Sequence, residues 1–185
     1  MSADPHLTLG EFLDWEQRQE SKHEFVAGRV VAFAGGTLGH TFLANLLVAR
    51  ILPQAAPCRT YGSDALIQTG RSFRYADVVV TCDERDRDPA ARVVVGPKVI
   101  IEVLSESTAA VDRGEKLDEY RSIDTLAEYV LLDSRTRWCA TYRRREGAWL
   151  ASLPIAAGEL VLESLGIAIN LDALYDEAGI ESVSL

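Results

Sequence analysis

An apolar stretch over residues 99–104 is interrupted by one carboxylate, Glu102. A continuous apolar run of this length is typical of a strand that is buried on both faces of a sheet. Glutamate is seldom fully buried without a partner, because an unpaired charge in an apolar interior is costly. The pattern therefore indicates either a functional carboxylate that a metal or a lysine offsets, or a structural ion pair with Lys116 or Arg113.

A helix is predicted next, over residues 111–123, after a short polar stretch at 105–108. The helix contains Asp112, Lys116 and Tyr120, which are spaced by four positions and so share one face. A strand carboxylate followed closely by a helix lysine can supply a metal ligand and a cation for phosphate. Asp112 and Tyr120 either orient the lysine or only cap and pack the helix.

Asp77 is a second carboxylate beside an apolar run, because it stands directly before three consecutive valines. We expect residues 73–80 to form one strand. If that strand pairs with the strand at 99–104, the side chains of Asp77 and Glu102 converge at one sheet edge. The alternative interpretation is that Asp77 only caps a loop at the start of the strand.

Hydrophobic periodicity predicts the remaining elements. Thr8 can cap a helix over residues 8–20, with Glu11 as its capping-box partner. A hairpin is predicted at 23–34, with its turn at residues 27–28. The other predicted elements are a buried helix at 37–52, a strand at 58–68, a surface loop at 83–91, a strand at 126–133, a hairpin at 137–153 and a short helix at 171–179.

This order of elements predicts one domain over residues 1–185, of the α+β class (α/β in character) with a mixed sheet. A chain of 185 residues is long enough to build one substantial core. Within the domain we expect an N-terminal helix and hairpin at 8–36, a core at 37–155 and a C-terminal tail at 156–185.

The composition is that of an ordinary water-soluble globular protein, with 25% charged and 48% apolar residues. No apolar run approaches the roughly 20 residues that span a bilayer, and the N-terminal residues lack a signal-peptide pattern. Cys58, Cys82 and Cys139 are scattered, without Cys-x-x-Cys spacing. We therefore expect a cytoplasmic protein with no disulfide and no zinc site.

The net charge of -9 argues against a generic nucleic-acid-binding surface, which normally needs a basic face. Arginines are nevertheless dense at residues 135–145. This cluster is either a solvated strand face or a surface that contacts DNA or another subunit.

Asp77 and Glu102 are residue types that bind magnesium. Mg²⁺ typically takes one or two protein carboxylates, several waters and phosphate oxygens of a substrate, and Mn²⁺ can substitute. Such an ion lowers the pKa of a bound water and neutralises charge on the phosphoryl group. Lys116 would stabilise the developing charge or orient the water.

Several segments together resemble a known family. They are HEFVAGRVV at 23–31, a helix that opens with His40, YADVVV at 75–80, IIEVLSEST at 100–108, the helix face of residues 112, 116 and 120, and AEYVLLD at 127–133. This combination resembles the Uma-two family of restriction endonucleases, within the PD-(D/E)XK nuclease superfamily. The similarity covers roughly residues 8–155, and residues 99–133 are its most specific part.

The resemblance implies a restriction-endonuclease-like core, a mixed sheet flanked by helices, acting on DNA with Mg²⁺. By position, Asp77 and Glu102 match the metal-binding carboxylates, and Lys116 matches the catalytic lysine. Glu24 resembles the family's early glutamate, which adds a metal ligand or supports one; otherwise it is an exposed strand residue. His40 is either part of this site or a structural histidine that forms hydrogen bonds.

The sequence departs from the superfamily pattern at three positions. Leu104, and not lysine, stands two residues beyond Glu102, so the lysine must reach the site from the following helix. Ala76 and Glu106 replace prolines, which affects backbone stiffness more than chemistry.

Two functions therefore remain open. The first is a DNA endonuclease that hydrolyses phosphodiesters with a metal-activated water. The second is a non-catalytic binding or assembly module with a nuclease fold, acting as a homodimer; the acidic charge and the displaced lysine favour it. The position of Lys116 discriminates between them, because a catalytic lysine must face Asp77 and Glu102.

Overall fold

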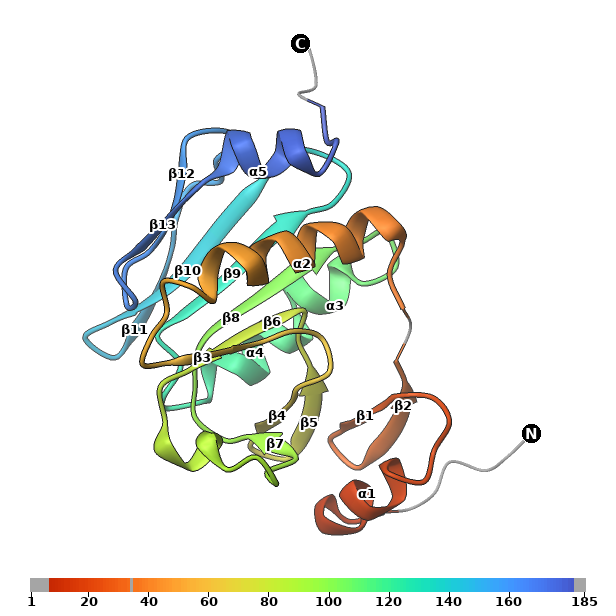
Figure 1. The fold of residues 1–185 in the computed structure, drawn as a ribbon. Helices are drawn as coiled ribbons and strands as arrows, with labels where there is room; N and C mark the ends of the chain where they lie inside the picture. Colours follow the sequence, from red (N-terminus) through yellow and green to blue (C-terminus); the bar gives the residue numbers. More distant parts are fainter. Residues whose placement is uncertain (1–6, 34, 182–185) are drawn as a thin grey trace.

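The computed structural model describes residues 7–33 and 35–181, which form a mixed α+β fold around a six-stranded sheet (Figure 1). The strands of this sheet are β3 (Arg59–Tyr61), β6 (Val78–Thr81), β8 (Pro97–Leu104), β9 (Glu128–Asp133), β10 (Cys139–Arg145) and β11 (Ala148–Ala151). They are ordered β11-β10-β9-β8-β6-β3. β8 and β9 run parallel, and the other neighbouring pairs are antiparallel.

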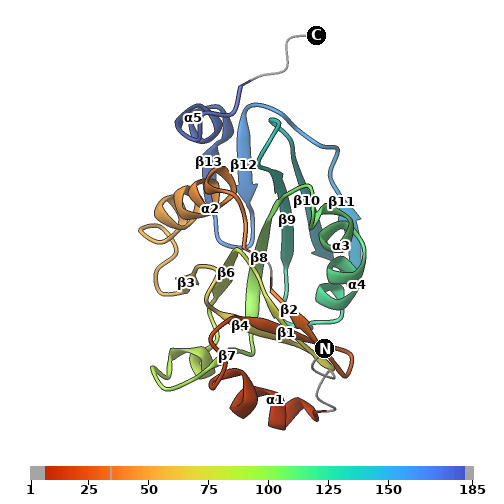
Figure 2. The ribbon, with the colours of Figure 1, turned by 90° about the vertical axis from the view of Figure 1, so that its right-hand side faces the viewer.

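Helices cover both faces of this sheet (Figure 2). α2 (Leu38–Ile51) and α5 (Leu171–Glu177) pack on one face. α3 (Ala109–Arg113) and α4 (Glu115–Arg121) connect β8 to β9 across the other face. In the part of the chain that the structure describes, no helix has the length and apolar character needed to cross a membrane.

A second, five-stranded sheet holds the N-terminal hairpin. Its strands, in the order β2-β1-β5-β4-β7, are β2 (Arg29–Ala32), β1 (His23–Val26), β5 (Ser72–Tyr75), β4 (Leu66–Thr69) and β7 (Val93–Val94). α1 (Leu9–Glu16) packs on this sheet through the fully buried Phe12. Its ring centroid lies 5.3 Å from that of Phe25 and 5.8 Å from that of Phe73. This aromatic cluster fixes the hairpin against β5.

Several predicted elements are confirmed. Thr8 and Glu11 form the predicted capping box at α1, although the helix ends at Glu16 and not at residue 20. Thr37 caps α2, which ends at Ile51. The hairpins β1–β2 and β10–β11 are present with the expected turns. The first hairpin was predicted to reach residue 34, which lies outside the described residues.

The C-terminal region holds more structure than the predicted tail and short helix. β12 (Glu159–Leu162) and β13 (Ile167–Asn170) form an antiparallel hairpin before α5. The alternate apolar side chains of this hairpin, Leu160, Leu162, Ile167 and Ile169, are buried in the same core as α2. Their alternation is a period-two strand signal that the sequence analysis overlooked.

The prediction of one strand over residues 73–80 is wrong. The chain breaks at Ala76–Asp77, so that β5 belongs to the small sheet and β6 to the large one. Side chains replace strand partners at this break: Glu24 accepts the N–H of Tyr75, and Asp77 accepts the N–H of Val103.

Two other elements are also divided. The predicted strand at 58–68 is β3 and β4, which lie in different sheets. The predicted helix at 111–123 is α3 and α4, separated at Gly114. The loop at 83–91 includes a short 3₁₀ helix, η1 (Glu84–Arg87). Local sequence patterns predicted the type of each element but not the points where it breaks.

The prediction of no disulfide is also wrong, because Cys58 and Cys82 are bonded to each other. β3 pairs with β6 so that Arg59 lies opposite Thr81. Cys58 precedes Arg59 and Cys82 follows Thr81, so this register brings the two cysteines together. A sequence separation of 24 residues gives no signal of this contact, since it depends on the strand register. Cys139 is a free, buried cysteine.

We predict that the C-terminal helix contributes to global stability. Leu174 of α5 is fully buried, so Leu174→Ala should lower the free energy of unfolding by about 2–5 kcal/mol. Leu153→Ala, at a side chain that is 88% exposed, should change it by less than about 0.5 kcal/mol. Urea denaturation of both variants provides the measurement. Equal losses would contradict the placement of α5 in the main core.

Candidate active site

β8 is the strand that positions Glu102. Along it, Ile101 and Val103 belong to the core beneath α2 and α5, whereas Ile100 and Leu104 belong to the core beneath α4. Glu102 lies two residues from both Ile100 and Leu104, and side chains two residues apart in a strand point to the same face. Its side chain is therefore directed towards α4. Because Glu102 is only 3% exposed, it needs a polar partner on that side of the sheet.

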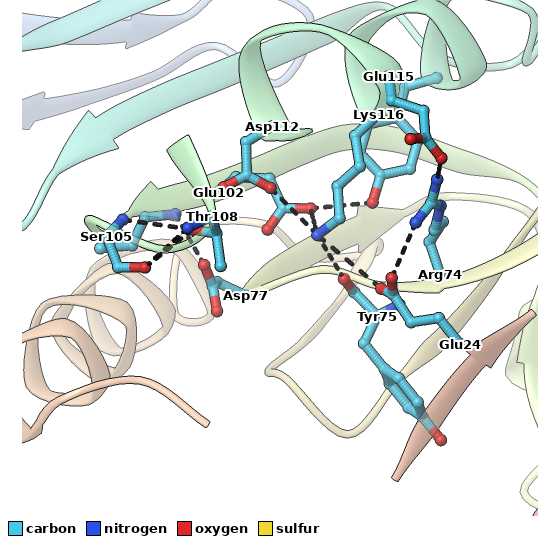
Figure 3. A network of polar contacts seen from close by, with 12 residues as sticks. Glu24, Arg74, Tyr75, Asp77, Glu102, Ser105, Thr108, Asp112, Glu115 and Lys116 are labelled. Carbon is cyan, nitrogen blue, oxygen red and sulfur yellow. Dashed lines mark hydrogen bonds and ion pairs between the residues drawn. The ribbon is translucent and has the colours of Figure 1, made fainter. Parts of the chain in front are cut away.

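Lys116 of α4 is this partner (Figure 3). Its Nζ lies 2.9 Å from Oε1 of Glu102 and 3.3 Å from Oδ1 of Asp112, and it donates to the carbonyl of Tyr75 at 3.2 Å. The hydroxyl of Tyr120, one turn further along α4, donates to the same Glu102 oxygen at 2.9 Å. The predicted shared face is therefore present, although the helix is broken between α3 and α4.

Asp77 lies in the break between β5 and β6, beside β8. Its Oδ2 accepts the backbone N–H of Val103 at 2.7 Å and lies 3.1 Å from Nε2 of His40. Because Val103 follows Glu102 directly, the Asp77 carboxylate is held against the backbone next to Glu102. His40 lies in the first turn of α2, and the backbone of Gly36 packs so closely on its ring that a Cβ there would collide with it.

Arg74 and Glu24 form a second buried network beside the first. Nη1 of Arg74 lies 2.9 Å from Oε2 of Glu24, whose Oε1 is 3.9 Å from Nζ of Lys116. Arg74 also binds two carboxylates of α4, Glu115 and Glu119. Glu24 therefore links the N-terminal hairpin to the Lys116 cluster through β5.

Two adjoining cavities reach these groups. The smaller, of about 30 Å³, is lined by His40, Asp77, Glu102, Asp112 and Lys116, together with residues of the surrounding loops. The larger, of about 560 Å³, lies between the β1–β2 hairpin and the region of α3 and α4. Both Asp112 and Lys116 line the two cavities, so the large cavity lies beside the small one.

The cluster concentrates negative charge. Burial raises the pKa of Glu102 well above its usual range; Lys116 opposes this rise, whereas Asp112 and Asp77 add to it. Burial lowers the pKa of Lys116, but the surrounding carboxylates, Glu102 first, more than offset this, so its pKa is raised. The hydrogen bond to Asp77 raises the pKa of His40 against the opposing effect of burial. The raised pKa values of Lys116 and His40 thus show carboxylates that favour a nearby cation, whereas the raised pKa of Glu102 is mainly an effect of burial.

The seven candidate residues from the sequence come together in this region. They are Glu24, His40, Asp77, Glu102, Asp112, Lys116 and Tyr120. Arg74 is not among the residues that the sequence singled out. Its signal was an arginine between two aromatic residues in a strand, a position that is buried here. Thr108, which the sequence placed only in the polar stretch at 105–108, lines both cavities.

The donor set fits a magnesium ion. Oδ1 of Asp77 and Oε2 of Glu102 accept no hydrogen bond from another described residue, and both side chains line the small cavity. Oδ1 of Asp112 is buried and, although 3.3 Å from Lys116, has no partner in hydrogen-bond geometry. Within residues 7–33 and 35–181, no group of three or more His, Cys, Asp or Glu could hold a metal by itself. Mg²⁺ needs only one or two carboxylates, since water and phosphate complete its shell.

The mixed sheet flanked by helices is a restriction-endonuclease-like fold, as predicted. A crystal structure of "a putative nuclease belonging to DUF820" from Anabaena variabilis has a TM-score of 0.76 to this chain. The alignment covers 93% of this chain and 99% of that chain, at 16% sequence identity.

The chain belongs to the Uma2 family, described as "Putative restriction endonuclease", whose pattern matches residues 9–174. The family resemblance seen in the sequence is thus confirmed. "Uncharacterized protein slr1290" of Synechocystis sp. is 34% identical over 176 residues, which cover 92% of each chain. "Uncharacterized protein sll1609" of the same organism is 36% identical over 133 residues, covering 69% of this chain and 75% of that protein.

We predict that Lys116 holds the carboxylate cluster together. Lys116→Met should lower the free energy of unfolding by about 3–5 kcal/mol, because it leaves buried carboxylates without their cation. Adding Glu102→Gln should recover part of this loss, since one of those charges is then removed. Lys98→Met, at a partly exposed lysine at the start of β8, serves as the control. Urea denaturation measures all variants, and strictly additive losses for Lys116 and Glu102 would contradict the coupling.

Proposed function

We propose that this protein is a magnesium-dependent endonuclease that hydrolyses phosphodiester bonds in DNA. The main support is the buried contact between Glu102 of β8 and Lys116 of α4, beside the Asp77 carboxylate. A carboxylate pair with an adjacent lysine is suited to bind a metal ion and a phosphate together. Membership of the Uma2 family agrees with this chemistry.

In each proposed metal ligand, one carboxylate oxygen is held by neighbouring groups, and the other accepts no hydrogen bond from the described residues. Lys116 and Tyr120 both bind Oε1 of Glu102. The Val103 N–H and His40 bind Oδ2 of Asp77. In the proposed site, Asp77 and Glu102 would hold Mg²⁺ through their other oxygens. The bound ion supplies an activated water and neutralises charge on the phosphate.

The role of Lys116 follows from its position. Its ammonium group lies beside Glu102, where it would stabilise the negative charge that develops on the phosphate oxygens. Leu104, which occupies the position of the superfamily's strand lysine, is fully buried in the core beneath α4. The helix lysine would thus take over the function of the strand lysine.

This arrangement favours the catalytic hypothesis over the non-catalytic module. The module hypothesis would gain support if Lys116 pointed into solvent, whereas Lys116 is only 6% exposed and faces Glu102. The homodimer, the cytoplasmic location and the use of Mn²⁺ stay predictions from the sequence.

Metal binding can be measured without knowledge of the substrate. Calorimetric titration with Mg²⁺ and Mn²⁺ should show about one ion per chain, and the double variant Asp77→Asn/Glu102→Gln should lose this binding. Glu106→Gln, at an exposed carboxylate in the loop after β8, is the matched control. Titration with Mn²⁺ decides the case, because Mg²⁺ often needs substrate phosphate to complete its shell. Absence of Mn²⁺ binding to the wild type would contradict the proposed metal site.

Cleavage provides the direct test of function. The wild-type protein should cut DNA in the presence of Mg²⁺ and not in EDTA. Glu102→Gln should abolish cleavage while circular dichroism shows an intact fold, whereas Glu106→Gln should retain it. Cleavage that persists in Glu102→Gln would sink the assignment of the active site.

A further inference from the structure

The large cavity beside the site indicates how a substrate strand would be held. One wall is the β1–β2 hairpin, and the other is formed by α3, the start of α4 and the loop before α3. Phe33, Thr108, Asp112 and Lys116 line both this cavity and the small one that contains Asp77 and Glu102. A group in the large cavity would therefore lie directly beside a phosphate at the proposed metal site.

Both walls of this cavity expose apolar side chains, beside charged residues such as Glu24, Arg74 and Glu115. Val31 of β2 is 44% exposed and Val111 of α3 is 38% exposed, and they line the cavity from opposite walls. The partly buried ring of Phe33 contributes a third apolar surface. Ser107 and Thr108 add hydroxyl groups. Exposed apolar side chains beside polar and charged groups suit a nucleobase, which has apolar faces and polar edges.

The volume also fits such a ligand. A cavity of about 560 Å³ lies within the roughly 300–1,000 Å³ that is usual for small-molecule sites. A single nucleotide is a ligand of this size class.

Arg29 is an exposed cationic residue that lines the cavity. Ala27 and Gly28 form the hairpin turn with positive φ angles, so that β2 begins at Arg29. Arg29 forms no ion pair with another described residue. Its guanidinium group is thus available to a phosphate next to the bound base.

The arginines of residues 135–145 do not offer a comparable basic surface. Arg143 pairs with Glu128 and Glu163, and Arg137 pairs with Asp172 and Asp176. These contacts join β10 and the loop before it to β9, to the turn after β12 and to α5. A protein that follows a DNA duplex needs several phosphate contacts at once, which a chain of net charge -9 with internally paired arginines supplies poorly.

We propose that the cavity between the β1–β2 hairpin and α3 binds one unpaired base next to the phosphodiester that is cut, so that single-stranded DNA is preferred over closed duplex. This inference rests on the proposed nuclease function. In a closed duplex the base is paired and stacked, and it must be extruded before it can enter the cavity. Stacking of bases on aromatic side chains, together with cations for the backbone, is the usual source of affinity for single strands. Phe33 is the aromatic side chain among the residues that line this cavity, and Val31 and Val111 would add apolar contacts.

The test is a binding measurement that does not depend on cleavage. Fluorescence anisotropy, with Ca²⁺ in place of Mg²⁺, compares a labelled oligothymidylate of roughly a dozen nucleotides with a duplex of the same length. Wild-type protein should bind the single strand at least about tenfold more tightly. Val31→Glu and Val111→Glu, which place a carboxylate in the cavity, should each weaken binding by about tenfold or more. Val161→Glu, at a similarly exposed valine of β12, should leave it unchanged.

The outcomes separate this inference from the proposed function. Mn²⁺ calorimetry and thermal unfolding should be unchanged in the three valine variants, which shows that the fold and the metal site are intact. Equal affinity for duplex, no effect of the two cavity variants, or no oligonucleotide binding at all would overturn the role of the cavity, even if Glu102→Gln abolishes cleavage. Conversely, loss of binding in the cavity variants supports that role even if Glu102→Gln still cleaves DNA.

Discussion

The buried contact between Glu102 and Lys116 is the constraint on which the site depends. Neither charge tolerates an apolar interior alone, because desolvation costs several kcal/mol for each ion. Together with the Tyr120 hydroxyl, the two groups satisfy each other between β8 and α4. The crossover from β8 to β9 must therefore pack so that α4 lies over Glu102. The apolar residues around the pair, Leu117 of α4 and Ile100 of β8, complete that packing.

Buried carboxyl groups nevertheless outnumber the cationic groups Lys116, Arg74 and His40 around this site. Glu24, Asp77, Glu102 and Asp112 are all at most 7% exposed. Arg74 offsets Glu24, but it also binds two carboxylates of α4 and so is divided among three partners. An arrangement that served only stability would gain little from carboxylates in excess of their cations. The excess is understandable if a divalent cation belongs at this edge of the sheet.

Sequence reasoning succeeded where the signal was local. Glu102 was visible because a carboxylate interrupts an apolar strand, and Lys116 because of its spacing from Asp112 and Tyr120. That spacing survives the break at Gly114, since Nζ of Lys116 still lies 3.3 Å from Asp112. The fold class, the capping box of α1 and the hairpins likewise follow from signals within short segments.

Contacts between distant segments gave no such signal. The bond between Cys58 and Cys82 depends on the register of β3 against β6. The break at Ala76–Asp77 depends on Glu24 of β1, which accepts the N–H of Tyr75, and on Val103 of β8, whose N–H donates to Asp77. The burial of Arg74 depends on carboxylates of β1 and α4. Each of these features becomes predictable only after the sheets are assembled, because the stabilising partner is far away in the sequence.

The position of the lysine on a helix has a consequence for how the site is assembled. A strand lysine two residues after Glu102 would face the site as soon as β8 formed. Leu104 occupies that position and adds to the core instead. Lys116 reaches Glu102 only when α4 is docked, so the proposed active site and the hydrophobic packing of α4 form together. Substitutions that loosen α4 should therefore weaken the site before they unfold the sheet, which couples stability to function more tightly than a strand lysine would.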